Sequence, residues 1–189
     1  MKFLELREII KGNLFTFLDV VKFFPEENPG LVKTQLARFV QKGLIKRIKR
    51  GLFCFDESQL DELELANFLY QPSYISLETA LNYSGIIPDI PRAVTSVCLT
   101  TTKKISNQFG SFYYAKIKPA LFFGFLKVKS PVSENYFNLA RKEKALLDYF
   151  YLRKIKKTDD LRLDLKDLDI KRYKKYSQYL PRWVQKIKL

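Results

Sequence analysis

The sequence predicts an α+β protein in which a small N-terminal module, residues 1–56, precedes a larger mixed α/β domain, residues 57–189. Helical periodicity and turn signals are dense in the first 55 residues, and β-branched and aromatic segments separated by Pro and Gly follow from residue 86. A chain of 189 residues, 47% of them hydrophobic, has enough core material for two folded domains.

The N-terminal module begins with a short amphipathic helix. Thr16 is followed three residues later by Asp19, which is a capping-box pattern, and apolar residues then recur at helical spacing. Pro25 ends this helix because proline cannot continue it. Residues 26–30 form a turn before the next helix.

The second helix is predicted from Asn28, which can cap it, to Gly43. One side of it is an apolar stripe, formed by Val32, Leu36, Phe39 and Val40. At 100° per residue the opposite side consists of hydrogen-bond donors, namely Thr34, Arg38 and Gln41, flanked by Lys33 and Lys42. We expect the apolar side to be buried and the donor side to face outward.

A basic hairpin follows the second helix. Residues 44–48 and 52–55 have the composition of two short strands, and residues 49–51 form the turn between them. Helix, turn, helix and hairpin is the order of a winged helix-turn-helix. Between residues 28 and 55 the chain carries seven Lys or Arg side chains and no acid.

This pattern is typical of a surface that binds double-stranded DNA, because each cation placed against a phosphate releases condensed counterions. In the major groove Arg reads guanine and Gln reads adenine. We therefore expect Thr34, Arg38 and Gln41 to contact bases. The expected phosphate contacts are Lys33, Lys42, Lys46, Arg47, Lys49 and Arg50. The alternatives are a merely solvated basic face and a winged helix that docks a protein partner.

The larger domain reads as a mixture of helices and strands. Helices are predicted over residues 61–70, 76–85 and 142–152, and a basic helical stretch from residue 165 onward. Strands are predicted over residues 94–100, 111–117 and 121–128.

Charge is unevenly distributed along the chain, whose net charge is +14. Residues 1–55 carry 11 basic and 5 acidic side chains, residues 56–91 carry 7 acids and no base, and residues 92–189 carry 23 bases and 8 acids. The acidic block is either a partner-facing patch or a solvated helix pair. Distinct charged faces imply distinct partners.

Composition also excludes several classes of function. Histidine is absent, which excludes Ser-His-Asp and Cys-His nucleophiles and histidine-ligated metals. Cys54 and Cys98 have apolar neighbours, so we expect reduced core thiols. No stretch resembles a signal peptide or a membrane span. We expect a cytoplasmic protein that is not an enzyme and needs no cofactor.

Two clusters in the last 31 residues admit a second interpretation. Clustered carboxylates could serve a two-metal nuclease, although the interleaved leucines favour a solvated amphipathic element with no metal; they are Asp159, Asp160, Asp164, Asp167 and Asp169. A possible second phosphate-binding surface comprises Lys171, Arg172, Lys174 and Lys175. Aromatic residues lie among and after these cations, namely Tyr173, Tyr176, Tyr179 and Trp183. They either stack on unpaired nucleotides or belong to the core, as their helical spacing favours.

Three stretches resemble the abortive-infection AbiEi antitoxin family. They are FVQKGLIKR at 39–47 with GLF at 51–53, YISLETAL at 74–81 with Gly85, Ile86 and Pro91, and ARKEKALLD at 140–148. The resemblance spans residues 15–152. It implies a winged helix followed by an α/β domain, and an autorepressor that binds its own promoter. It also implies an antitoxin role in a toxin-antitoxin pair whose toxin is nucleotidyltransferase-like.

Overall fold

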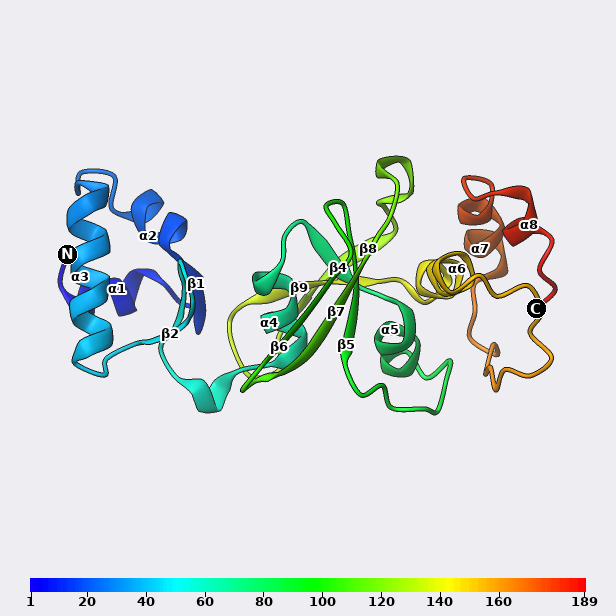
Figure 1. Cartoon of the computed structure of the whole chain (residues 1–189), viewed down its shortest axis with the longest axis horizontal. Helices are drawn as coiled ribbons and strands as arrows, with labels where there is room; N and C mark the ends of the chain where they lie inside the picture. The colour runs from blue at the N-terminus through cyan, green and yellow to red at the C-terminus, as the bar shows by residue number, and fades with distance from the viewer. The chain divides into compact units, whose positions relative to one another are not determined.

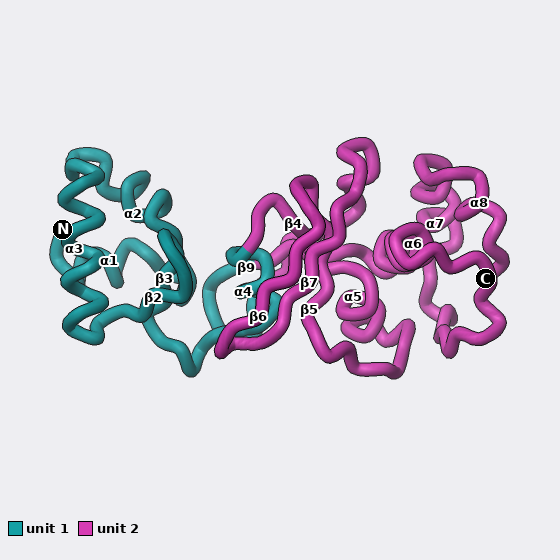
Figure 2. Tube along the Cα trace, in the orientation of Figure 1, with its two compact units in different colours: residues 1–69, 129–136 teal, residues 70–128, 137–189 magenta.

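The structure, a computed structural model, describes all 189 residues and confirms an α+β protein (Figure 1). The chain forms two compact units (Figure 2). Unit 1 comprises Met1–Leu69 and Lys129–Tyr136, and unit 2 comprises Tyr70–Val128 and Phe137–Leu189. Unit 1 thus continues past residue 56 and includes a second segment that is distant in the sequence.

Unit 1 combines helices with a small antiparallel sheet. Its elements in chain order are α1 (Phe3–Ile9), β1 (Leu14–Thr16), α2 (Phe17–Phe23), α3 (Pro29–Gln41), β2 (Lys46–Lys49), β3 (Leu52–Cys54), the 3-10 turn η1 (Glu57–Gln59) and α4 (Glu62–Leu69). The strand order is β1-β3-β2, so β3 is the central strand.

The caps predicted for α2 and α3 are confirmed. The Thr16 hydroxyl accepts from the Asp19 N–H at 3.1 Å, and the Asp19 carboxylate accepts from the Thr16 N–H at 2.7 Å. Asn28 accepts from the Gly30 N–H at 2.8 Å and so satisfies a free donor at the start of α3. Gly43, with φ +68°, follows the end of α3 in the left-handed region that glycine enters without strain.

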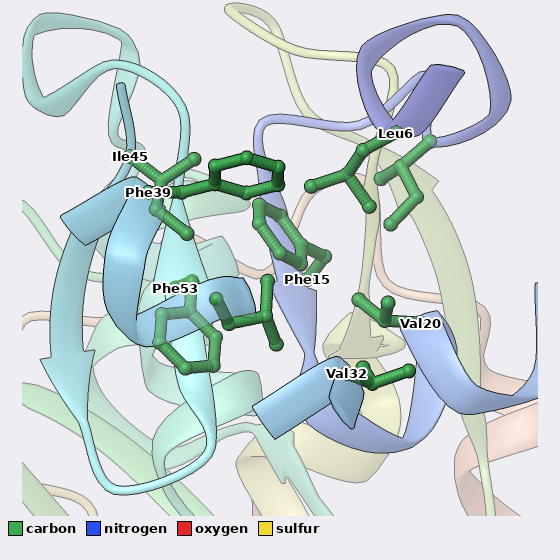
Figure 3. Packing of buried hydrophobic residues seen from close by; sticks show 9 residues of the cluster. Leu6, Phe15, Val20, Val32, Phe39, Ile45 and Phe53 are labelled. Atoms are coloured by element: carbon green, nitrogen blue, oxygen red, sulfur yellow. The ribbon is translucent and has the colours of Figure 1, made fainter. Parts of the chain in front are cut away.

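The core of unit 1 joins all three N-terminal helices to the sheet (Figure 3). Its buried members are Leu6, Ile10, Phe15, Val20, Val32, Leu36, Phe39, Ile45 and Phe53. Helix α1 and strand β1 were not predicted, yet both contribute to this cluster. The aromatic side chains pack in contact, with the Phe15 and Phe53 rings stacked at 5.8 Å.

The segment Lys129–Tyr136 is held in unit 1 by hydrogen bonds. The buried Glu64 carboxylate accepts from the Ser133 hydroxyl at 2.7 Å and from the Asn135 amide. The Asn135 amide also donates to the Leu14 carbonyl at 2.9 Å. A Cβ at Gly12 would lie 1.5 Å from the Asn135 side-chain oxygen, so a larger residue there would displace this amide.

Unit 2 contains a six-stranded mixed sheet and four helices. Its elements are β4 (Ser73–Ile75), α5 (Leu77–Tyr83), β5 (Val94–Cys98), β6 (Lys103–Asn107), β7 (Gly110–Lys116), the 3-10 turn η2 (Pro119–Leu121), β8 (Phe125–Lys129), β9 (Tyr136–Ala140), α6 (Lys142–Arg153), α7 (Ile170–Ser177) and α8 (Arg182–Gln185). The strand order is β6-β7-β5-β4-β9-β8, with β4–β9 and β5–β7 parallel.

Helix α6 is central to the packing of unit 2. It packs against α5, α7 and α8, and α5 also packs on β5. Its buried residues include Ala145, Leu146, Leu147 and Phe150, whereas Tyr149 and Leu152 are only half-buried.

Some predicted boundaries in unit 2 are wrong. Residues 121–124 are not a strand, because Pro119 starts a 3-10 turn and Gly124 takes a φ of +78° before β8 begins. The basic C-terminal stretch becomes helical only after Asp169, which caps α7, and Pro181 separates α7 from α8.

Candidate nucleic-acid interface

Helix α3 is fixed by its apolar side. Val32, Leu36 and Phe39 are buried in the core of unit 1, and Val40 packs against that core (Figure 3). The predicted apolar stripe is therefore confirmed. The burial of one side determines which side chains of the helix point toward solvent.

The outward side of α3 carries the donors that the periodicity predicts. Exposed residues on this side are Lys33, Thr34, Arg38, Gln41 and Lys42. Arg38 and Gln41 have no hydrogen-bond or ion-pair partner within the protein, so their donors are available to a ligand. The Thr34 hydroxyl donates to the Gly30 carbonyl at 3.0 Å, which leaves its oxygen as an acceptor.

Leu31 is a further residue on this side that the sequence reasoning missed. Its side chain is 64% exposed, and it precedes Thr34 and Arg38 by three and seven residues, which is one face of a helix. An exposed apolar group on the same face as Thr34 and Arg38 can contact a thymine methyl group. The spacing that places Leu31 on this side is visible in the sequence.

The hairpin β2–β3 places its cations on the edge strand. Lys46 pairs with Cys54 and Arg47 with Phe53, and a register shift follows before Lys49 pairs with Leu52. The turn contains Gly51 with φ +78°. The predicted cations of this hairpin are all exposed, namely Lys46, Arg47, Lys49 and Arg50.

These four cations differ in whether the protein already binds them. Lys46 lies 3.7 Å from the Glu57 carboxylate, and the Lys49 ammonium donates to the Leu69 carbonyl. Arg47 and Arg50 have no partner within the protein. The structure therefore leaves the two arginines as the freest cations of the hairpin.

The inner side of the hairpin is apolar and chemically inert. Leu52, Phe53 and Cys54 are buried in β3, and burial raises the pKa of Cys54 to about 12. Burial also raises the pKa of Cys98, whose thiol is 3.5 Å from the Thr101 carbonyl. Both cysteines are free and buried, which confirms the prediction of reduced core thiols.

The acidic block at residues 56–91 is largely used inside the protein. Asp56 and Asp61 accept backbone N–H groups at the starts of η1 and α4, and the Ser58 hydroxyl and N–H lower the pKa of Asp56. Glu64 is buried, and Glu78 forms a bidentate pair with Arg153 at 2.6 and 2.8 Å. These contacts favour a structural role over a partner-facing patch.

The predicted second phosphate surface on α7 is only partly available. Arg172 lies 3.1 Å from Asp169 and 3.5 Å from Glu143, so acids of the protein already bind it. The other three cations, Lys171, Lys174 and Lys175, are exposed. Tyr173 belongs to the core, and burial raises its pKa to about 12.

The carboxylates between residues 159 and 169 do not converge. Asp164 accepts from the Lys166 N–H at 3.2 Å, and Asp169 accepts from the Arg172 N–H at 3.0 Å. No group of three or more His, Cys, Asp or Glu side chains in the structure could hold a metal ion.

A buried polar cluster in unit 2 was missed by the sequence reasoning. Lys144 and Asp148 form an ion pair in α6, and both side chains are 0% exposed. The Asp148 carboxylate also accepts from the Tyr74 and Ser76 hydroxyls, each at 2.9 Å. Lys144 donates to the Tyr74 oxygen at 3.0 Å, so this hydroxyl both donates and accepts.

The cluster joins two of the three stretches that carry the family resemblance, residues 74–81 and 140–148. Burial and the Asp148 carboxylate raise the pKa of Tyr74, so its phenol stays protonated. Burial raises the pKa of Asp148, while the Lys144 ammonium opposes this effect. Glu143 is also buried, and it accepts from the Asp169 N–H at 3.1 Å.

Comparison with protein-family models and with curated proteins finds no match for the chain. None of its helices has the length and apolar character needed to cross a bilayer.

Proposed function

We propose that unit 1 contains a winged helix-turn-helix that binds double-stranded DNA. Helices α2 and α3 with their turn are the helix-turn-helix, α3 is the recognition helix, and the hairpin β2–β3 is the wing. The element order α1-β1-α2-α3-β2-β3 and the three-stranded antiparallel sheet support this proposal.

One observation carries the proposal. The apolar side of α3 is buried, while the Arg38 and Gln41 side chains are exposed and have no partner within the protein, in a stretch of 28 residues that contains seven basic side chains and no acid. A solvated face needs no such exclusion of acids. A surface that approaches phosphates does, because a nearby carboxylate would oppose counterion release.

The side chains divide into two roles. Arg38 reads guanine, Gln41 reads adenine, and Leu31 and Thr34 contact neighbouring base edges. Six cations bind phosphates, the last four of them from the wing: Lys33, Lys42, Lys46, Arg47, Lys49 and Arg50. Phosphate contacts set the register of the protein on the duplex, and base contacts give selectivity.

The test is a binding-site selection with the full chain and a randomised DNA duplex, followed by affinity measurements. Arg38→Ala should lose about 1–3 kcal/mol on the selected site and bind unrelated duplexes almost as before. Arg92→Ala, which removes an exposed, unpaired arginine of unit 2, should have no effect. If the Arg38 variant retains full affinity and selectivity, α3 is not the reading helix.

The biological setting of the proposal rests on the family resemblance. We propose that the protein is a transcriptional autorepressor and the antitoxin of a toxin-antitoxin pair whose toxin is nucleotidyltransferase-like. Selective binding to the DNA upstream of its own gene would support the autorepressor. A nucleotidyltransferase in the adjacent reading frame, made harmless by co-expression of this chain, would support the antitoxin.

A further inference from the structure

A surface cavity of unit 2 gathers cations and aromatic rings from separate parts of the chain. Its volume is about 840 Å³, and the side chains that matter are Lys116, Lys118, Lys154, Lys156, Tyr151 and Trp183. They come from the end of β7, the start of η2, the last turn of α6 with the residues after it, and α8. None belongs to the proposed duplex interface in unit 1, so the two sites can be tested separately.

The charge of this lysine–tryptophan cavity is of one sign. No carboxylate lines it, and none of its four lysine ammonium groups forms an ion pair or a hydrogen bond within the protein. Two arginines of unit 2, by contrast, are bound by acids of the protein, Arg153 by Glu78 and Arg172 by Asp169. Like charges that converge without acids repel one another, and they concentrate anions from solution.

Lys154 occupies a backbone position that favours glycine. It follows α6 as a left-handed C-cap with φ 56°, and its N–H bonds to the Phe150 carbonyl. An L side chain is strained in this conformation, and most helices use glycine there. Lys154 thus combines a strained backbone position with a charge that lies beside three other lysines, and such strain is concentrated at functional sites.

The aromatic rings add a stacking surface. Tyr151 and Trp183 lie nearly parallel, at 28°, with centroids 6.3 Å apart, and both side chains are half-buried. Aromatic rings beside a row of cations are the combination that binds unpaired nucleotides, because bases stack on the rings while phosphates meet the cations. A duplex cannot use it, since its bases are already stacked within the helix.

We propose that this cavity binds a single-stranded nucleic acid, with a base stacked on Trp183 and the adjacent phosphates held by the lysines. The structure changes the sequence-based interpretation of this region. Tyr173 belongs to the core, and Arg172 is bound by acids of the protein. The cations near Trp183 come from β7, η2 and the end of α6 instead.

Trp183 is the one tryptophan of the chain, so its fluorescence reports on this site alone. Titration of the full chain with an oligothymidylate or oligouridylate of about 10 nucleotides should quench this fluorescence. Comparison of the oligothymidylate and oligouridylate titrations shows whether the site prefers DNA or RNA. A duplex bound by unit 1 should leave the fluorescence nearly unchanged.

Two variants separate a binding role from a structural one. Lys154→Gly combined with Lys156→Gln should keep or raise the unfolding midpoint, because glycine relieves the strain. The same variant should weaken oligonucleotide binding roughly 10-fold and reduce the slope of log affinity against log salt by about 1.4, the value for two phosphates of a single strand. Lys103→Gln with Lys127→Gln removes equal charge from exposed positions of unit 2 outside the cavity and should change affinity less than about twofold.

Trp183→Leu should weaken binding of a labelled oligonucleotide about 5- to 100-fold, and Trp183→Phe should retain most of it. The proposal is overturned if neither oligonucleotide quenches the fluorescence. It is also overturned if the two lysine double variants lose equal affinity for the oligonucleotide. Binding instead to vesicles of phosphatidylcholine and phosphatidylglycerol, abolished by the Lys154 and Lys156 changes, would assign the cavity to a lipid surface and also overturn it.

Discussion

Arg38 in α3 and Lys144 in α6 are both cations on amphipathic helices, yet the two units place them in opposite environments. Arg38 is exposed and has no partner, in a stretch without acids. Lys144 is 0% exposed and paired with Asp148, with the Tyr74 hydroxyl as a second acceptor. The difference lies in the acids and hydroxyls that each fold supplies, not in the helices.

The comparison shows how to separate functional cations from structural ones in a chain with a net charge of +14. Arg153, Arg172 and Lys144 are satisfied by carboxylates of the protein. The cations of α3, the two arginines of the hairpin and the four lysines of the cavity are not. The second set is therefore available to external anions.

The largest expected effect comes from breaking the buried pair. Asp148→Asn leaves the Lys144 charge buried without a counterion, so the free energy of unfolding should fall by about 3–5 kcal/mol. Urea denaturation followed by circular dichroism measures this loss. Lys144→Met combined with Asp148→Leu should recover part of it, because an apolar pair leaves no charge unpaired.

The control for that variant is an exposed pair. Glu134→Gln removes the partner of Lys129, and these two side chains are 63% and 51% exposed. Its effect should stay below about 1 kcal/mol, since solvent screens such pairs. A loss of similar size for Glu134→Gln and Asp148→Asn would remove the distinction between the buried and exposed pairs.

The buried side of the hairpin predicts a pH dependence. Burial raises the pKa of Cys54 from 9.0 to about 12, so the unfolded chain loses this proton first as the pH rises. The contribution of this thiol to the free energy of unfolding is therefore fully present below pH 9 and is lost between pH 9 and 12, by about 1.4 kcal/mol at pH 10. Denaturation of Cys54→Ala should show a shallower decline over this range. Identical declines would mean that burial does not raise the pKa of the Cys54 thiol.

Helix α3 should depend on its cap. Asn28→Ala removes the acceptor of the Gly30 N–H and should destabilise unit 1 by about 1 kcal/mol. Asn28→Asp keeps the acceptor and serves as the matched control. Thermal unfolding distinguishes the two, and equal midpoints for the wild type and the alanine variant would show that the cap contributes nothing.

The smallest effects are expected when single cations of the hairpin are replaced. Arg50→Ala should weaken binding to all duplexes alike and reduce the salt slope by about 1, as expected for one phosphate contact. Lys49→Ala should change the slope less, because its ammonium already donates to the Leu69 carbonyl. Salt titrations of both variants measure this, and a larger change for Lys49 would reverse the assignment.

The features predicted correctly from the sequence are local ones. The capping box at Thr16, the cap at Asn28, the stripe through Val32, Leu36 and Phe39, and the turn at Gly51 all depend on neighbours a few residues apart. Each is determined by helical spacing or by backbone sterics, so its position in the chain is enough to predict it.

The features that were missed depend on distant residues. Strand β4 is three residues long and gains its place by pairing with β5 and with β9, more than 60 residues away. The Lys144–Asp148 pair has the spacing of an exposed helix pair, and only the hydroxyls of Tyr74 and Ser76 make its burial possible. The cavity around Trp183 likewise unites elements that no local pattern connects.

The most direct test of the central claim is photocrosslinking from α3. A benzophenone side chain in place of Gln41, irradiated with the selected duplex, should crosslink to bases, whereas the same group in place of Lys171 on α7 should not. Crosslinking from position 171 with none from position 41 would contradict the assignment of α3 as the helix that reads DNA.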